Sequence, residues 1–118
     1  LGGPIDESVQ VLSELKEKRL LLYILSNWSA ETYPIAEERF DFLSWFDGKI
    51  ISGEAGIVKP DLEIYKLLMN RYEVKPQHTV FIDDKEENIK AAELLGIHGI
   101  HFQNASKLRK DLQMLKLL

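Results

Sequence analysis

Residues 79–84 read TVFIDD, a short apolar run that stops at two adjacent carboxylates. Four consecutive β-branched or aromatic residues, with no polar residue alternating between them, are typical of a strand covered on both faces. Asp83 and Asp84 then mark the point where this strand ends. The stretch therefore predicts a buried strand of a parallel sheet, with acidic side chains at its carboxyl end.

The sequence on either side alternates between strand-like and helix-like patterns. A second continuous apolar run, residues 20–25, ends at Ser26 and Asn27. Shorter strand-like stretches occupy residues 49–51 and 97–102. Helical spacing of apolar residues predicts helices over residues 6–18, 31–40, 86–95 and 106–117, with another beginning at Asp61. This alternation predicts an α/β fold of the three-layer, Rossmann-like kind, with helices on both faces of a mainly parallel sheet.

Local signals suggest where three of these helices begin or end. Asp6 and Asp61 are residues of the type that caps a helix N-terminus, and each precedes an apolar helical pattern. Gly96 follows the pattern of residues 86–95 and is expected to end that helix. We therefore expect the helices to start at Asp6 and Asp61 and to stop at Gly96.

Composition limits the classes of protein to consider. The chain has 118 residues, 45% of them hydrophobic and 29% charged, and a formal net charge of −4, which suits one globular domain. The acidic balance argues against general nucleic-acid binding, and no apolar run approaches the ~20 residues of a membrane span. The absence of cysteine excludes disulfides, thiolate metal sites and cysteine nucleophiles. Because the start carries no signal-peptide pattern, we expect a cytoplasmic protein.

Polar residues gather where the predicted strands end. Ser26 and Asn27 follow one strand, the acidic pair follows another, and Lys59 lies in a loop before a helix. Parallel strands would bring these groups to one edge of the sheet. A hydroxyl and turn N–H groups can hold phosphoryl oxygens, and an ammonium can neutralise their charge. Adjacent carboxylates are the hard ligands that Mg²⁺ prefers, so the pattern indicates phosphoryl chemistry with Mg²⁺ as cofactor.

The order of these groups resembles a known family. Ser26-Asn27 after an apolar strand, Lys59-Pro60 before a helix, and residues 81–84 with Asn88 are similar to motifs two, three and four of the haloacid dehalogenase-like hydrolases. The resemblance extends from Pro4 to about residue 112. It is strongest to the subfamily with a helical cap inserted after the first strand, whose members are mostly phosphatases.

The resemblance implies a role for each motif residue. Ser26 would hydrogen-bond the transferring phosphoryl group together with the backbone amide of Asn27, and Lys59 would bridge the nucleophile and the phosphoryl oxygens. Asp84 would be the Mg²⁺ ligand, with Asp83 beside it in direct or water-mediated support. Asn88 would orient the loop or a metal-bound water.

One motif of the family is missing. Its nucleophile lies in an Asp-x-Asp at the end of the first strand, and no such pair exists among these residues. The chain looks like the later part of such an enzyme, residues 1–118 being a partial core without the first strand, the nucleophile and the cap. In the family that strand lies between the strands that here end at Ser26 and Asp83. We therefore expect an N-terminal segment, a strand from a neighbouring chain, or a rearranged sheet.

The leading hypothesis is the C-terminal core of a Mg²⁺-dependent phosphatase of a small phosphorylated metabolite. Two alternatives remain open: a dehalogenase of 2-haloacids, which the acidic pair disfavours, and a non-catalytic binding or regulatory module of the same fold. Trp28 directly follows the phosphate-binding turn, so that it either lines a substrate entrance or packs structurally. His98 and His101 would lie on opposite faces of a strand and receive no catalytic role.

Overall fold

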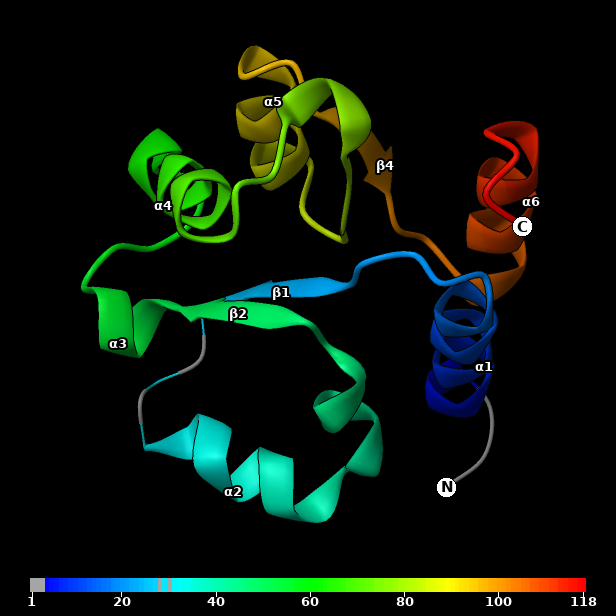
Figure 1. Cartoon of the computed structure of the whole chain (residues 1–118), viewed down its shortest axis with the longest axis horizontal. Coiled ribbons are helices and arrows are strands. Elements are labelled where there is room, and N and C mark those ends of the chain that lie inside the picture. The colour runs from blue at the N-terminus through cyan, green and yellow to red at the C-terminus, as the bar shows by residue number, and fades with distance from the viewer. Residues whose placement is uncertain (1–3, 28, 30) are drawn as a thin grey trace.

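A computed structural model of the chain describes residues 4–27, 29 and 31–118. It is an α/β structure in which four short strands alternate with helices (Figure 1). The elements in chain order are α1 (Pro4–Glu17), β1 (Tyr23–Ser26), α2 (Thr32–Arg39), the 3₁₀ turn η1 (Asp41–Trp45), β2 (Gly48–Ile51), α3 (Ser52–Ala55), α4 (Leu62–Tyr72), η2 (Pro76–His78), β3 (Val80–Asp83), α5 (Glu86–Leu94), β4 (His98–His101) and α6 (Ala105–Met114).

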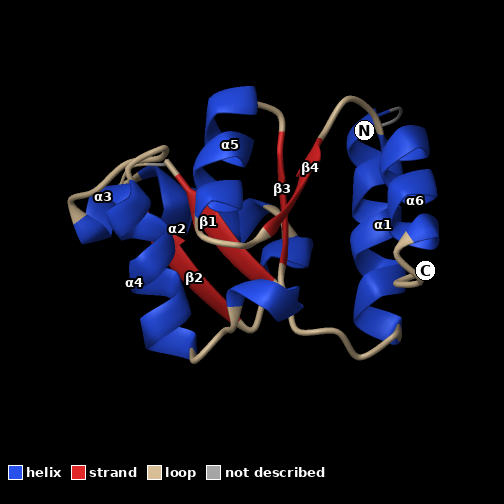
Figure 2. Cartoon of the chain, turned by 90° about the horizontal axis from the view of Figure 1, so that it is seen from above, coloured by secondary structure: helices blue, strands red, loops and turns tan. Residues whose placement is uncertain are grey.

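The strands form two parallel pairs. β1 pairs with β2 in a register that sets Ser26 against Ile51, and β3 pairs with β4 so that Asp83 lies opposite His101. Within the described residues no ladder joins the two pairs, which form separate two-stranded sheets (Figure 2). The predicted parallel α/β architecture is confirmed, and its sheet is divided between the strands that end at Ser26 and Asp83.

Helices cover the strands from two sides, and each side has its own apolar core. α1 and α6 lie side by side on one flank, while α4 and α5 lie on the other (Figures 1 and 2). The first core combines α1 and α6 with β4 and consists of Val11, Leu15, Leu22, Ile100, Ala105, Leu108 and Leu112. The second joins β2 with α4 and α5 and consists of Ile50, Ile64, Tyr65, Ala91, Ala92 and Ile97. This layering is the three-layer arrangement that the sequence predicts.

Two of the three predicted helix boundaries are confirmed. The Asp61 side chain caps α4 by accepting a hydrogen bond from the Glu63 backbone N–H at 2.9 Å. Gly96 follows the end of α5 with a φ of +84°, a conformation that glycine adopts without strain. The prediction for Asp6 is wrong, because α1 begins at Pro4, whose fixed φ suits the first turn of a helix.

The outer edge of β2 is closed by an aromatic side chain from α4. The Tyr72 hydroxyl accepts a hydrogen bond from the Lys49 backbone N–H at 2.9 Å and donates one to the Lys49 carbonyl at 3.0 Å. A Cβ atom on Gly48 would lie 2.4 Å from the Tyr72 ring, so only glycine allows this approach. The hydroxyl thus takes the place of a further strand at this edge.

No helix within the described ranges has both the length and the apolar character needed to cross a membrane.

Candidate active site

Four chain segments contribute to the candidate site. The turn after β1 carries Asn27, the loop before α4 carries Lys59, and the end of β3 carries Asp83. The first turn of α5 adds Asn88. Because each parallel strand delivers its last residue to the same edge, residues 24 to 32 positions apart in sequence come into hydrogen-bond contact there.

A buried ion pair lies at the centre of the site. Lys59 Nζ donates to Asp83 Oδ2 at 2.6 Å, and the two side chains are only 12% and 6% exposed. The Asp83 carboxylate also accepts from the Lys85 backbone N–H at 2.9 Å and from Asn88 Nδ2 at 3.2 Å. Three donors therefore converge on one carboxylate, which satisfies the charge inside the protein.

These contacts set the protonation state of Asp83. Burial raises the pKa of the carboxyl, but the hydrogen bond and charge of Lys59, together with the bonds from Lys85 and Asn88, outweigh it. The pKa of Asp83 consequently lies below its ordinary value of 3.8. Asp83 is therefore a carboxylate at neutral pH, and Lys59 faces a full negative charge.

Lys59 is held both at its backbone and at its ammonium. Its backbone N–H donates to Asn27 Oδ1 at 2.9 Å, and its carbonyl accepts from Asn27 Nδ2 at 3.4 Å. Its ammonium also lies 5.7 Å from the centroid of the Phe81 ring, within the range of a cation–π contact. The backbone and the ammonium of Lys59 are thus fixed by different neighbours.

Tyr65 is a supporting residue that the sequence reasoning missed. Its hydroxyl donates to the Asn88 carbonyl at 2.8 Å, and its ring meets Phe81 edge-on, with centroids 5.3 Å apart. Burial raises the pKa of the phenol to about 12, with the Asp83 charge adding to the shift. The available signal was its hydroxyl, since a buried tyrosine needs a hydrogen-bond partner.

Asp84 differs from its neighbour Asp83. The residue is exposed, and its backbone carbonyl lies 2.9 Å from His101 Nε2. Within the described ranges no three His, Asp or Glu side chains cluster as a complete metal site. An exposed carboxylate directly after the buried Asp83 nevertheless fits Mg²⁺, which is commonly bound by one or two carboxylates with water and substrate phosphate. Asp84 thus fits the role of a single protein ligand.

Of the two remaining predicted site residues, the structure describes Ser26 but not Trp28. Ser26 is the last residue of β1 and is partly buried, directly before Asn27. Trp28 lies outside the described residues, so the prediction that it lines the substrate entrance or packs structurally stays as it is.

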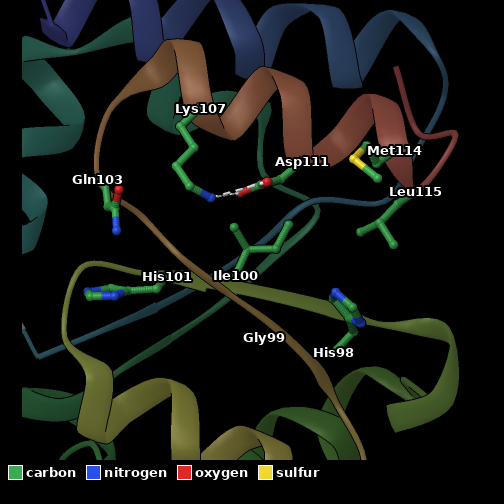
Figure 3. A pocket seen from close by; sticks show the side chains of 9 residues that line it. All are labelled: His98, Gly99, Ile100, His101, Gln103, Lys107, Asp111, Met114 and Leu115. Atoms are coloured by element: carbon green, nitrogen blue, oxygen red, sulfur yellow. Dashed lines mark hydrogen bonds and ion pairs between the residues drawn. The ribbon is translucent and has the colours of Figure 1, made fainter.

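A groove runs along β4 on the side of α6, with a volume of about 350 Å³. His98 and His101 lie at opposite ends of it, and the Lys107–Asp111 ion pair of α6, 3.0 Å between Nζ and Oδ2, borders it (Figure 3). Lys59, Asp83 and Asn88 do not line the groove. It is therefore a surface feature beside the site rather than its substrate pocket.

The chain is similar to known hydrolases. Residues 2–96 match a family model described as haloacid dehalogenase-like hydrolase. A sesquiterpene phosphatase from Aspergillus oryzae is 30% identical over 95% of this chain and 57% of that protein. A flavin mononucleotide hydrolase from Arabidopsis thaliana is 31% identical over 92% of this chain and 44% of that protein. The chain thus spans about half the length of these curated relatives.

Solved structures show the same fold. A HAD-superfamily hydrolase from Ehrlichia chaffeensis superposes with a TM-score of 0.76 at 25% identity, over 94% of this chain and 58% of that one. A HAD family enzyme from Bacteroides thetaiotaomicron, solved in complex with magnesium and inorganic phosphate, superposes with a TM-score of 0.72 at 28% identity, over 80% of this chain and 52% of that one. Together with the family match over most of its length, these likenesses show that the chain belongs to the haloacid dehalogenase-like hydrolases.

Proposed function

We propose that this chain is the C-terminal part of the catalytic core of a Mg²⁺-dependent phosphatase that acts on a small phosphorylated metabolite. The observation that carries the proposal is the buried Lys59–Asp83 pair beside the turn after β1. A lysine held at 2.6 Å from a buried carboxylate, at the edge where parallel strands end, is suited to neutralising a phosphoryl group. Phosphatases among the relatives support the same reaction class.

Each residue has a distinct role in this proposal. The Ser26 hydroxyl and the Asn27 backbone N–H bind the non-bridging phosphoryl oxygens, and the Lys59 ammonium offsets the charge that develops on them. Asp84 holds Mg²⁺, which when bound adds further positive charge at the phosphoryl group. Asp83 already accepts three hydrogen bonds and therefore positions Lys59 and supports the metal only through water.

The nucleophile is proposed to be an aspartate outside these 118 residues. Its carboxylate oxygen forms a bond to phosphorus while the bond to the alcohol oxygen breaks, and the departing oxygen takes a proton from water to leave as the alcohol. The hydroxide that remains accepts the proton that the attacking water gives up in the second step. Water then attacks the aspartyl-phosphate, which releases inorganic phosphate and restores the carboxylate. In this proposal Lys59 and Ser26 stabilise the phosphoryl charge in both steps.

The divided sheet supports the proposal that a further strand belongs between β1 and β3. Among the described residues these strands are each paired on one side only, whereas the outer edge of β2 is closed by Tyr72. Backbone groups of an unpaired buried strand are costly, so a strand in this position would stabilise both pairs. We propose that the segment carrying the nucleophile supplies this strand, from the same polypeptide or from a neighbouring chain.

The proposal is tested by measuring hydrolysis of p-nitrophenyl phosphate by the full-length gene product, with Mg²⁺ and after EDTA treatment. Lys59→Ala and Asp84→Ala are each expected to remove most of the activity, because one takes away the ammonium and the other the metal ligand. Lys66→Ala, which removes an exposed lysine on α4, is the matched control. Full activity in either site variant contradicts the proposal, and activity on a 2-haloacid that survives EDTA indicates a dehalogenase instead.

A further inference from the structure

The side chain of Asn27 forms a two-point contact with the backbone of Lys59. Asn27 Oδ1 accepts from the Lys59 N–H at 2.9 Å, and Asn27 Nδ2 donates to the Lys59 carbonyl at 3.4 Å. A side-chain amide that engages both the donor and the acceptor of one residue imitates a peptide group of a neighbouring strand. The contact joins two loops that are 32 residues apart in sequence.

We propose that this contact, the Asn27–Lys59 clamp, makes Asn27 a positioning residue for the lysine ammonium. The inference rests on the proposed phosphatase function and extends it, because that function uses only the backbone amide of Asn27. The clamp fixes the start of the lysine side chain, while Asp83 and the Phe81 ring fix its end. The ammonium is thereby held in place before substrate binds.

The physical reason lies in the length of the lysine side chain. A free lysine populates many rotamers, and immobilising them costs conformational entropy. Electrostatic stabilisation of a transition state is most effective when the charged group needs no reorganisation as the reaction proceeds. If the backbone of Lys59 shifts, the ammonium is held less firmly against the Asp83 carboxylate. Part of the electrostatic stabilisation of the transition state is then lost.

The clamp can be removed without touching the proposed phosphate contact. Asn27→Ala deletes the side-chain amide but keeps the backbone N–H that would bind a phosphoryl oxygen. Asn27→Ser retains one hydrogen-bonding group and is expected to fall between wild type and Asn27→Ala. The control is Asn104→Ala, because the Asn104 side chain caps α6 by accepting from the Lys107 N–H at 2.8 Å. Loss of that cap destabilises the protein without involving Lys59.

The first measurement does not depend on activity. Acetylation of each lysine in the full-length gene product is followed over time by peptide mass spectrometry, with the exposed Lys66 as internal reference. In Asn27→Ala, Lys59 should react about tenfold faster than in wild type. This is the factor expected when the hydrogen bond from the Lys59 ammonium to the Asp83 carboxylate is weakened. In Asn104→Ala its rate should stay at the wild-type value.

The second measurement separates kcat from KM for p-nitrophenyl phosphate. Asn27→Ala should lower kcat about tenfold and change KM by less than about twofold, because the clamp acts mainly when charge develops. An unchanged acetylation rate of Lys59, an unchanged kcat, or an equal fall of kcat in Asn104→Ala would each overturn the inference. A wild-type protein without phosphatase activity overturns the proposed function instead, and acetylation alone then decides whether the clamp holds Lys59.

Discussion

Replacing Lys59 by methionine tests the energetic importance of the buried ion pair. The substitution keeps most of the apolar stem and leaves the Asp83 carboxylate buried without its cation. Removing one partner of a buried pair typically costs about 3–5 kcal/mol of unfolding free energy. Asp83 keeps its bonds from the Lys85 N–H and from Asn88, so we expect the lower end, about 3 kcal/mol.

The effect should depend on pH with a definite sign. The pKa of Asp83 in the folded protein lies below its ordinary value of 3.8, so the pair stabilises fully above that pH. The contribution is lost as pH falls through the folded-state pKa, where Asp83 becomes protonated. The difference between wild type and Lys59→Met should therefore be largest near neutral pH and should shrink below about pH 4.

Urea unfolding of the full-length gene product, followed by circular dichroism, measures both quantities. Lys66→Met is the matched control, because Lys66 pairs with Glu63 across an exposed turn of α4 and should contribute below about 0.5 kcal/mol. Adding Asp83→Asn to Lys59→Met should restore part of the stability by removing the unpaired charge. A cost for Lys59→Met no larger than that for Lys66→Met, or a difference that does not change with pH, would refute the reasoning.

Three further predictions concern the edge of the sheet, a helix contact and the proposed metal ligand. Tyr72→Phe should lower the unfolding free energy by about 1–2 kcal/mol in urea denaturation, because both hydrogen bonds to Lys49 are lost while the ring stays. Gly99→Ala should cost about 1–3 kcal/mol, since its Cβ would lie 2.6 Å from Ile89 Cγ2; a double variant with Ile89→Ala that recovers no stability would contradict this. Asp84→Asn should weaken Mg²⁺ binding by about tenfold or more in isothermal titration calorimetry, and unchanged affinity would exclude Asp84 as a ligand.

The parts of the fold that depend on local pattern could be predicted from the sequence. The apolar runs indicated strands that end close to Ser26 and Asp83, and Asp61 and Gly96 marked helix boundaries correctly. These features depend on neighbouring residues, so a short window of sequence contains the information. The prediction that a helix starts at Asp6 is wrong because a proline two residues earlier begins the same helix.

The internal contacts of the site could not be predicted in the same way. The sequence placed Lys59 and Asp83 at one edge, but it did not distinguish a buried, fully hydrogen-bonded Asp83 from an exposed Asp84. It also gave no sign that the Asn27 side chain binds the Lys59 backbone or that the Tyr65 hydroxyl supports Asn88. Such bonds depend on the relative position of segments more than 20 residues apart, which is decided by packing rather than by local pattern.

The central claim is that this chain supplies the charge-stabilising half of a phosphoryl-transfer site whose nucleophile lies elsewhere. The most direct test is to mix the full-length gene product with p-nitrophenyl phosphate and Mg²⁺, quench with acid, and locate any added phosphoryl group by peptide mass spectrometry. The account predicts a phosphoryl group on an aspartate outside residues 1–118, with its yield strongly reduced in Lys59→Ala. A phosphoryl group on a residue within this chain, or an equal yield in Lys59→Ala, would contradict it.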